Sequence, residues 1–451
     1  MTVHKSVNQS VNKRQIRLGA FLQGVGHHLA AWLHPEVNPR DLHDPRFYLD
    51  LARTAERGKF DAIFFADTLG MPEAPAVQLA RGLLPNNLDP ITLLGFIAGG
   101  TEKIGLISTL STSYIAPYHL ARKFATLDAI SGGRTGWNLV TSGTEWEAKN
   151  FNLDQQTAHT ERYQRAQEYV DVVKGLWDSW EDDAFIFDQA SGQVFHPEKL
   201  HVLNHKGKAF QVRGPLSSPR PVQGYPVIVQ AGSSSDGQAL ASATAEVVFT
   251  AQQTLTDARK FYLGLKDQVA AQGRSPDSVK IMPGVLPVIG RTEEEAKEKF
   301  EQLQSFIDPA IGLGLLGGFL GNVDLSAYPL DGPLPDLPPI EGWQSRQKLF
   351  IDLARSENLT IRQLYQRVAG ARGHRVILGT PSTIADQLED WFNNEAADGF
   401  NILPPTLPQG LNEFVDLVIP ELQHRELFRT EYSGNTLRDH LGLARPRNQY
   451  S

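Results

Sequence analysis

The stretch IGLISTLSTSYIAPYHLARKFATLDAISGGRTGWNLVTS (residues 104–142) contains one complete strand–helix–strand pattern. Its two ends, 104–111 and 134–142, are short runs rich in apolar residues, which is typical of parallel strands buried on both faces. The segment between them, 117–133, reads as an amphipathic helix. A strand, a helix and a second strand in this order predict one unit of an α/β fold.

The same alternation recurs along the chain. Six further runs are expected to be buried strands, at 16–23, 60–67, 226–232, 245–251, 280–290 and 399–405. Helical candidates lie between them, among them 46–58, 89–102, 293–307 and 381–394. Eight alternations of strand and helix, with no GxGxxG turn, favour a (β/α)₈ TIM barrel over a doubly wound sheet.

The chain is longer than a simple barrel. A barrel needs about 250 residues, so roughly 200 of the 451 residues must be insertions. Segment 181–225 has the Gly, Pro and alternating apolar residues of a hairpin excursion before the fifth strand, and segment 308–378 has a Gly/Pro-rich start followed by helical sequence. We expect a flexible N-terminus over 1–15 and a single barrel domain over 16–451, with 308–378 as a lid-like insertion.

Composition narrows the function. With 43 Lys and Arg against 51 Asp and Glu, the formal charge is −8 and no basic stripe stands out, so nucleic acid and membrane surfaces are unlikely partners and a small molecule is expected. The chain has no cysteine, so any redox chemistry must come from a cofactor. No signal sequence and no run of about 18 apolar residues occurs, which favours a cytoplasmic protein.

Polar residues at the ends of the expected strands are the first candidates for a site, because strand ends line the active face of a barrel. They include Asp67, Thr109 and Asn138. Asp67 has an alternative role as a cap of the following turn. In AGSSSDG (231–237), Ser233 and Ser234 lie between a strand and a helix, where backbone N–H groups either bind an anion or are satisfied by a capping hydroxyl.

A second anion site is suggested by HTERY (159–163). On a helix, His159, Arg162 and Tyr163 line one side of the first turn, where they would suit a phosphate or form only a polar helix start. Two further histidines, His28 and His34, follow the first strand together with His27. Because no third ligand with recognisable spacing accompanies them, no metal site is predicted.

Taken together, six stretches resemble one enzyme family. They are ERGKFDAIFFAD, STSYIAPYHLARKFATLDAISGGRTGWNLVTS, AKNFN, HTERYQRAQEYVDVVKGLWDSWEDDA, FQVRGPLSSPRPVQGYPVIVQAGSS and RTEYSGNTLRDHLGL. The chain resembles the bacterial-luciferase-like flavin-dependent monooxygenases, in the branch of nitrilotriacetate monooxygenase component A, dibenzothiophene-sulfone monooxygenase and long-chain alkane monooxygenase.

The resemblance implies a two-component reaction. FMNH₂ comes from a separate NAD(P)H:flavin reductase, reacts with O₂ to give a C4a-peroxyflavin, and oxygenates a small organic substrate. An N- or S-dealkylating hydroxylation, or oxygenation at sulfur or carbon, is expected. Homodimers or homotetramers are usual in such a family.

The resemblance also assigns roles to residues. Asp67, Thr109 and Asn138 would contact the flavin, and His159, Tyr163, Ser233 and Ser234 would hold its phosphate. His28, His34 and Asn138 are the candidate catalytic residues, with the two histidines above the flavin near the reacting oxygen. The alkane-oxidising relative has a histidine directly after the VTS of strand four, where this chain has Gly143, so no acid or base is assigned there.

Three other functions stay open. A barrel of this type can transfer hydride with the deazaflavin F420, or bind a flavin without catalysis. A metal-dependent hydrolase is disfavoured because no set of ligands occurs at the strand ends. For the substrate, scattered arginines such as Arg372 and Arg375 are the only candidates for a carboxylate clamp.

Overall fold

The computed structural model describes residues 14–73, 76–82, 88–340 and 344–451. The N-terminal segment expected to be flexible lies, over residues 1–13, outside the described residues. Among the helices of the described residues, none is both long and apolar enough to cross a bilayer.

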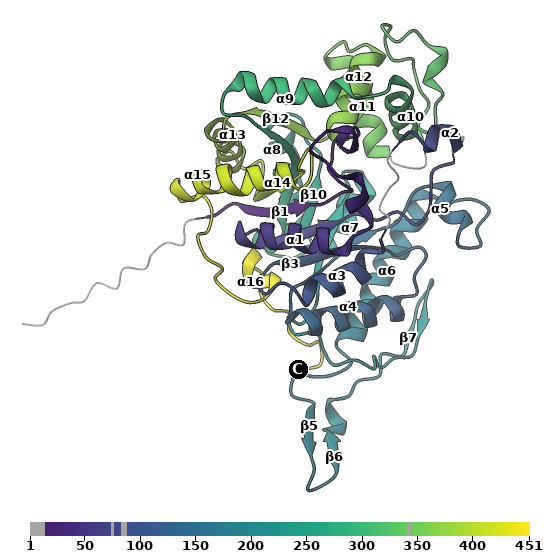
Figure 1. The fold of residues 1–451 in the computed structure, drawn as a ribbon. Coiled ribbons are helices and arrows are strands. Elements are labelled where there is room, and N and C mark those ends of the chain that lie inside the picture. Colours follow the sequence, from purple (N-terminus) through teal and green to yellow (C-terminus); the bar gives the residue numbers. More distant parts are fainter. Residues whose placement is uncertain (1–13, 74–75, 83–87, 341–343) are drawn as a thin grey trace, which may run out of the picture.

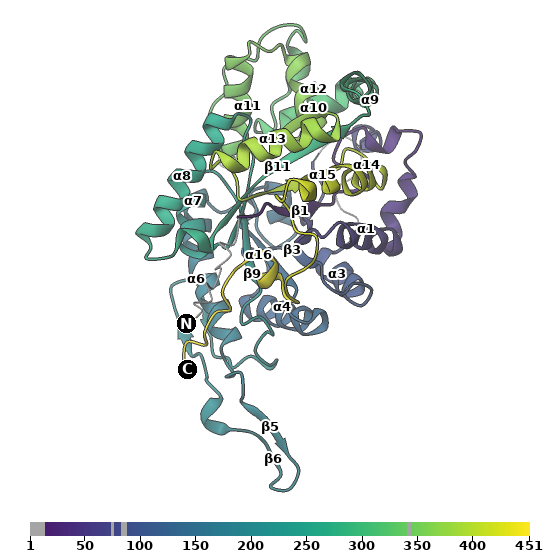
Figure 2. The same ribbon diagram turned by 90° about the vertical axis from the view of Figure 1, so that its left-hand side faces the viewer.

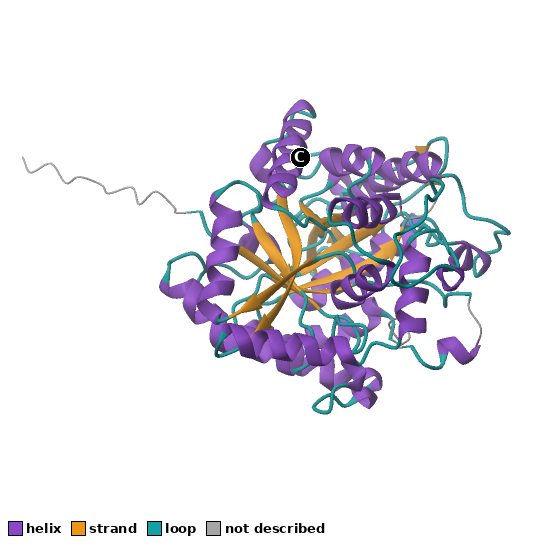
Figure 3. Ribbon diagram, turned by 90° about the horizontal axis from the view of Figure 1, so that it is seen from above, coloured by secondary structure: helices purple, strands orange, loops and turns teal. Residues whose placement is uncertain are grey.

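Eight parallel strands close into a barrel, which Figure 3 shows at the centre of the surrounding helices. In chain order they are β1 (Arg17–Phe21), β2 (Ala62–Phe65), β3 (Gly105–Ser111), β4 (Thr135–Val140), β9 (Val227–Ala231), β10 (Val247–Thr250), β11 (Lys280–Ile289) and β13 (Gly399–Ile402). They pair in the order β10-β9-β4-β3-β2-β1-β13-β11, and the pairing of β10 with β11 closes the ring. The predicted (β/α)₈ barrel and its eight strands are confirmed.

The barrel strands are separated by helices. Four of the five helices predicted by range lie within two residues of the predicted ends, and the one predicted over 89–102 ends at Ala98. Helix α3 begins at Pro90, and the Asp89 carboxylate accepts a hydrogen bond from the Thr92 N–H at 2.8 Å, which satisfies one of the free donors of the first turn. Helix α4 ends at Ser131 and is followed by Gly132, whose φ of 67° is a backbone conformation that glycine adopts without strain. The helices around the barrel are α1 (Pro45–Arg57), α2 (Ala76–Leu79), α3 (Pro90–Ala98), α4 (Pro117–Ser131), α5 (Glu145–Lys149), α6 (His159–Trp177), α7 (Ser235–Thr244), α8 (Leu255–Ala271), α9 (Glu293–Ser305), α13 (Pro381–Asn393), α14 (Gln409–Glu413) and α15 (Ile419–His424).

The first insertion consists of two small hairpins. Strands β5 (Phe185–Asp188) and β6 (Gln193–Phe195) form a hairpin that projects from the body in both Figures 1 and 2. Strands β7 (His205–Lys206) and β8 (Gln211–Val212) form the second. The hairpin excursion expected before the fifth barrel strand is therefore present.

The second insertion is a group of three helices, α10 (Pro309–Phe319), α11 (Gln344–Ser356) and α12 (Ile361–Ala371), that lie together at one end of the molecule (Figure 1). It ends in β12 (Arg375–Gly379), a ninth strand that the sequence analysis did not predict. Strand β12 exists because β11 is ten residues long: its first half pairs within the barrel, and Val285–Ile289 remains free to pair with β12.

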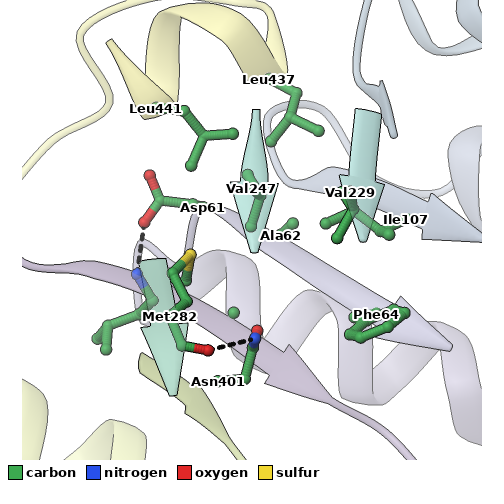
Figure 4. Close-up of a pocket in the computed structure, with 12 residues that line it drawn as sticks. Asp61, Ala62, Phe64, Ile107, Val229, Val247, Met282, Asn401, Leu437 and Leu441 are labelled. Atoms are coloured by element: carbon green, nitrogen blue, oxygen red, sulfur yellow. Dashed lines mark hydrogen bonds between the residues drawn. The ribbon is translucent and has the colours of Figure 1, made fainter. Parts of the chain in front are cut away.

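The N-terminal end of the barrel is closed by a short helix, α16 (Leu437–Leu441), from the C-terminal tail. Leu437 and Leu441 are buried and point into a small apolar pocket beside Ala62 and Val247 (Figure 4). A Cβ built on Gly105 would lie 2.5 Å from the Leu437 side chain, so only glycine leaves room for this helix. This pocket is part of the core and lies at the end of the barrel opposite the strand ends that carry the candidate site residues.

Candidate active site

Three phenylalanine rings form an apolar floor at the carboxyl ends of the barrel strands. Phe21, Phe64 and Phe249 come from β1, β2 and β10, and their ring centroids lie 4.8 Å (Phe21–Phe64), 5.3 Å (Phe21–Phe249) and 5.7 Å (Phe64–Phe249) apart. All three side chains are buried, and their tilted and edge-on contacts are favourable for aromatic rings. We call these three residues the phenylalanine floor. It lies between the packed barrel core and the open end of the barrel at the carboxyl ends of the strands, which we call the mouth.

A hydroxyl and an amide lie at the ends of β3 and β4. The Thr109 Oγ1 donates to the Phe65 carbonyl at 2.8 Å, and the Asn138 Nδ2 donates to Thr109 Oγ1, also at 2.8 Å. Both residues are buried, and the Asn138 Oδ1 has no hydrogen-bond partner among the described residues. A buried acceptor without a partner is costly, which is a reason to expect a ligand that donates to it.

Asp67 follows β2 and is only partly exposed. Burial, together with the nearby carboxylates of Asp89 and Glu147, raises the pKa of Asp67 to about 7, although the Thr68 N–H donates to its Oδ1 at 2.9 Å. The Thr68 N–H bond is the contact expected of a turn cap and favours the charged form, but burial outweighs it, so a role of Asp67 beyond capping stays a prediction. Carboxyl groups with such raised pKa values often lie in functional sites.

The raised pKa of Asp67 predicts a pH-dependent stability. The folded state holds the Asp67 proton more tightly than the unfolded chain, so the contribution of Asp67 to stability falls as the pH rises from about 4 to about 7. We expect Asp67→Asn to raise the free energy of unfolding by about 1–2 kcal/mol at pH 8, and by little at pH 4. Urea unfolding of both proteins across this range measures the difference. Asp50→Asn, at an exposed residue, is the control, and a difference that does not change with pH would contradict the prediction.

The two predicted anion-binding motifs meet at the first turns of α6 and α7. A Cβ built on Gly237 would lie 3.4 Å from the Tyr163 hydroxyl, so this hydroxyl reaches the start of α7. The His159 ring lies tilted against Tyr163 with 4.8 Å between centroids, and its Nδ1 lies 3.1 Å from the Asp236 carboxylate. His159 thus holds the carboxylate of Asp236 toward α6.

The first turn of α7 offers backbone donors at the same place. The Ser234 Oγ accepts from the Gly237 N–H at 3.1 Å, and the first bond within the helix runs from the Gln238 N–H to the Ser234 carbonyl. The N–H groups of Ser235 and Asp236 precede that bond, and the positive end of the helix dipole adds to them. Ser233 is anchored beside them by a 3.2 Å contact between its Oγ and the Thr250 hydroxyl. We call Tyr163, His159, Ser233, Ser234 and the first turn of α7 the anion cradle.

Other candidates lie elsewhere. Arg162 is buried in α6, and its Nη1 donates to the Thr157 carbonyl. His28 is buried with its ring near Phe300 of α9, and burial lowers its pKa to about 4. His34 lies in a loop with its ring near Phe306. No hydrogen bond or ring contact of the described chain joins His28 or His34 to Asn138, so their assignment as catalytic residues stays a prediction.

A cluster of cations and histidines at the mouth was not predicted as a unit. His27 follows β1, Arg346 lies in α11, and Arg372 and His374 lie between α12 and β12. The ring centroids of His27 and His374 are 5.9 Å apart, and Arg346 Nη2 lies 2.9 Å from His374 Nε2. The motif AGARGHRV was the feature of the sequence that pointed to a carboxylate clamp, but of its two candidate arginines only Arg372 belongs to the cluster. Arg375 lies over the Trp391 ring at 4.5 Å and donates to Gln387 instead.

Comparisons with known proteins agree with this arrangement. A family model described as luciferase-like monooxygenase matches residues 21–398. The chain is 51% identical to the N-acetyl-S-(2-succino)cysteine monooxygenase of Bacillus subtilis (strain 168), over 97% of this chain and 99% of that protein. It is 52% identical to nitrilotriacetate monooxygenase component A of Aminobacter aminovorans, over 96% and 98%. Among solved structures, a riboflavin lyase with modified FMN and riboflavin has a TM-score of 0.87 at 30% identity, over 96% of this chain and 97% of that chain.

Proposed function

Because the chain belongs to the luciferase-like monooxygenase family, we propose that it is the oxygenase component of a two-component system that uses reduced FMN. Membership confirms the resemblance expected from the sequence, in the branch of nitrilotriacetate monooxygenase component A, and makes the protein a monooxygenase. In the proposed reaction, a separate NAD(P)H:flavin reductase supplies FMNH₂, and one oxygen atom of O₂ enters a small organic substrate.

The anion cradle follows β4 and β9, which pair with each other, and the Thr109–Asn138 pair lies on β3 and β4. This placement on neighbouring strands is the observation that carries the proposal. A flavin mononucleotide has a dianionic phosphate at one end and a planar ring with a polar edge at the other. The anion cradle offers hydroxyls, N–H groups and a helix N-terminus to the phosphate. The unpartnered Asn138 Oδ1 and the Asp67 carboxyl offer acceptors to the ring, so the residues present fit FMN.

When bound, FMNH₂ supplies the electrons that activate O₂ and delivers one oxygen atom to the substrate. The chain has to bind the cofactor, orient it and keep water away. The phenylalanine floor closes the site on the side of the barrel core and so excludes water there. Thr109 and Asn138 hold each other in one orientation through their 2.8 Å hydrogen bond, which fixes the acceptor before a ligand arrives.

Insertion 308–378 is proposed as the cover over this mouth. It is tied to the loop after β1 by the Leu29 N–H, which donates to the Ala369 carbonyl at 2.9 Å, and to the loop after β10 by Gln253, whose Nε2 donates to the Gly373 carbonyl at 2.7 Å. Asp308, just before α10, pairs with Arg81 at 2.9 Å. Three contacts around the mouth suit a segment that limits access of water to the site.

The names of the relatives support a two-component reaction and a heteroatom-containing substrate. "Component A" denotes one part of a system with at least one further component, which fits a separate reductase. One relative is named for an S-substituted cysteine and the other for a tertiary amine, so oxygenation at sulfur, or at a carbon bonded to sulfur or nitrogen, is the proposed chemistry. A homodimer or homotetramer in the cytoplasm is proposed as well.

Hydride transfer with F420 is the alternative, and cofactor binding separates the two. We expect the purified protein to bind FMN at least about tenfold more tightly than F420, because the anion cradle at the start of α7 suits the terminal dianionic phosphate of FMN, whereas the phosphate of F420 is an internal diester. Isothermal titration with each cofactor measures both affinities. Tighter binding of F420 would favour the alternative, and binding of FMN without any oxygen uptake in its reduced form would favour a non-catalytic barrel.

A further inference from the structure

Two arginines at the mouth of the barrel have no acidic partner among the described residues. Among the buried arginines, Arg134 donates only to carbonyl oxygens and the Thr101 hydroxyl. Others are paired with carboxylates: Arg220 lies 3.0 Å from Asp178, Arg438 lies 2.7 Å from Glu246, and Arg429 contacts Asp61. By contrast, no carboxylate in the described chain lies within 4.0 Å of the guanidinium groups of Arg346 and Arg372. Both side chains are half-buried, and partial removal of a guanidinium from water without a counter-charge costs free energy.

These two arginines contact carbonyl oxygens and a histidine instead. Arg346 Nη1 donates to the Arg372 carbonyl at 2.7 Å, and Arg372 Nε donates to the His27 carbonyl at 3.4 Å. Arg346 Nη2 lies 2.9 Å from His374 Nε2. Because a guanidinium only donates, Nε2 of His374 must accept and its proton is on Nδ1. These bonds hold both arginines in place but leave their charges unneutralised.

The cluster therefore contains two positively charged groups, the guanidinium groups of Arg346 and Arg372. Burial lowers the pKa of Arg372 to about 10, and burial with repulsion from Arg372 lowers the pKa of Arg346 to about 10, so both stay charged near neutral pH. Burial and the two arginines hold the pKa of His27 and His374 well below the ordinary value, so both rings are neutral. The mouth thus carries positive charge that an anion can neutralise.

The cluster adjoins the phenylalanine floor and offers unsatisfied polar atoms there. The His374 ring stacks on Phe249 at 4.9 Å, and the His27 ring lies 5.5 Å from Phe21. His27 is 2% exposed and His374 is 4% exposed, yet Nδ1 of His374 has no hydrogen-bond partner among the described residues, and the His27 ring faces only the Ala371 carbonyl as a polar partner there. The residues of the cluster come from the loop after β1 and from the insertion after β11. Neither β1 nor β11 is a neighbour of β3 or β4 in the strand order, so the cluster lies on a different side of the mouth from Thr109 and Asn138.

We propose that Arg346 and Arg372 bind a carboxylate of the substrate, with His27 and His374 as neutral hydrogen-bonding groups beside it, so that the substrate is a small organic acid. This inference rests on the proposed function and names the substrate class of the same site. A planar, two-pronged guanidinium matches the two oxygens of a carboxylate. The proposed site for the phosphate of FMN is the anion cradle, which leaves this cationic site for the substrate.

Binding of a tricarboxylate probe tests the proposal without turnover. Tricarballylate, which has no oxidisable heteroatom, and its neutral triamide are titrated calorimetrically into the full-length protein with and without saturating FMN. The wild type is expected to bind tricarballylate and not the amide. Arg346→Gln and Arg372→Gln should each weaken tricarballylate binding at least about tenfold, and Arg372→Lys should weaken it less than Arg372→Gln.

Controls separate this proposal from a structural role and from the proposed function. Arg355→Gln, in the same helix α11 but exposed and paired with Asp336, should bind tricarballylate like the wild type. Thermal melting shows whether each variant is folded, and a melting temperature at least as high as the wild type is expected for Arg372→Gln because an unpaired charge is removed. No binding of tricarballylate by the wild type, or equal binding by the arginine variants, would overturn the proposal. It would also be overturned if the variants lost affinity for FMN but not for riboflavin, because the pair would then hold the cofactor phosphate. Failure of the wild type to bind FMN would count against the proposed function alone.

Discussion

Tyr163→Phe and His159→Ala are expected to weaken FMN binding by about 10- to 100-fold each while changing riboflavin binding by less than about threefold. Riboflavin lacks the phosphate, so a residue that contacts only the phosphate cannot matter to it. The substitution Tyr163→Phe removes one hydroxyl donor from the anion cradle. His159 acts partly through Asp236: without its ring at 3.1 Å, the Asp236 carboxylate keeps the Thr160 hydroxyl at 3.2 Å but is held less firmly, and it repels the phosphate when it turns toward it.

The difference between the two flavins is the informative quantity, and the same helix offers a control. Tyr169→Phe also removes a hydroxyl from α6, but that hydroxyl donates to the Ile115 carbonyl at 2.9 Å in the core. This variant should lose about 1 kcal/mol of stability and keep its preference for FMN over riboflavin. Equal loss of FMN and riboflavin affinity in the Tyr163 variant would place Tyr163 at the ring or in the fold rather than at the phosphate. A slower reaction at saturating FMN, with unchanged affinity, would return His159 and Tyr163 to catalysis.

The barrel was predictable because each strand carries its own local signal. The run FDAIFFAD, for example, contains Ala62–Phe65, whose side chains are all buried, so a continuous apolar run marks the strand. Strand β12 has no such local signal in its own sequence. Its residues Arg375–Gly379 are strand-like only because the far half of β11 offers a free edge, and the length of β11 beyond the barrel cannot be seen in the sequence of β12.

The anion cradle could be predicted in two halves but joined only in space. The motifs HTERY and AGSSSDG are about 70 residues apart, and each has a structural role as a helix start. What the sequence did not show is that α6 and α7 place Tyr163 against the first turn of α7. The family resemblance supplied that link.

The arginine and histidine cluster could not be predicted as a unit. His27 and Arg346 are more than 300 positions apart, and their meeting depends on how insertion 308–378 packs over the loop after β1. Arg372 and Arg375 look equivalent in the sequence. In the structure, Arg372 caps α12 with a φ of 51°, which turns it toward His27, while Arg375 lies in β12 beside Trp391. A local backbone conformation therefore decides which arginine lies at the mouth.

Product formation with and without oxygen is the most direct test of a monooxygenase that uses reduced FMN. The full-length protein, FMN, an NADH:flavin reductase and N-acetyl-S-(2-succino)cysteine or nitrilotriacetate are incubated in air and under argon, and organic products and oxygen uptake are measured. We expect product only in air, with at least one O₂ consumed per product, and a fall of at least about 100-fold under argon, because the oxygen atom transferred comes from O₂. Omitting the protein while keeping the reductase corrects for uncoupled oxidation of FMNH₂. Product formed equally under argon would contradict monooxygenation and indicate hydride transfer or hydrolysis.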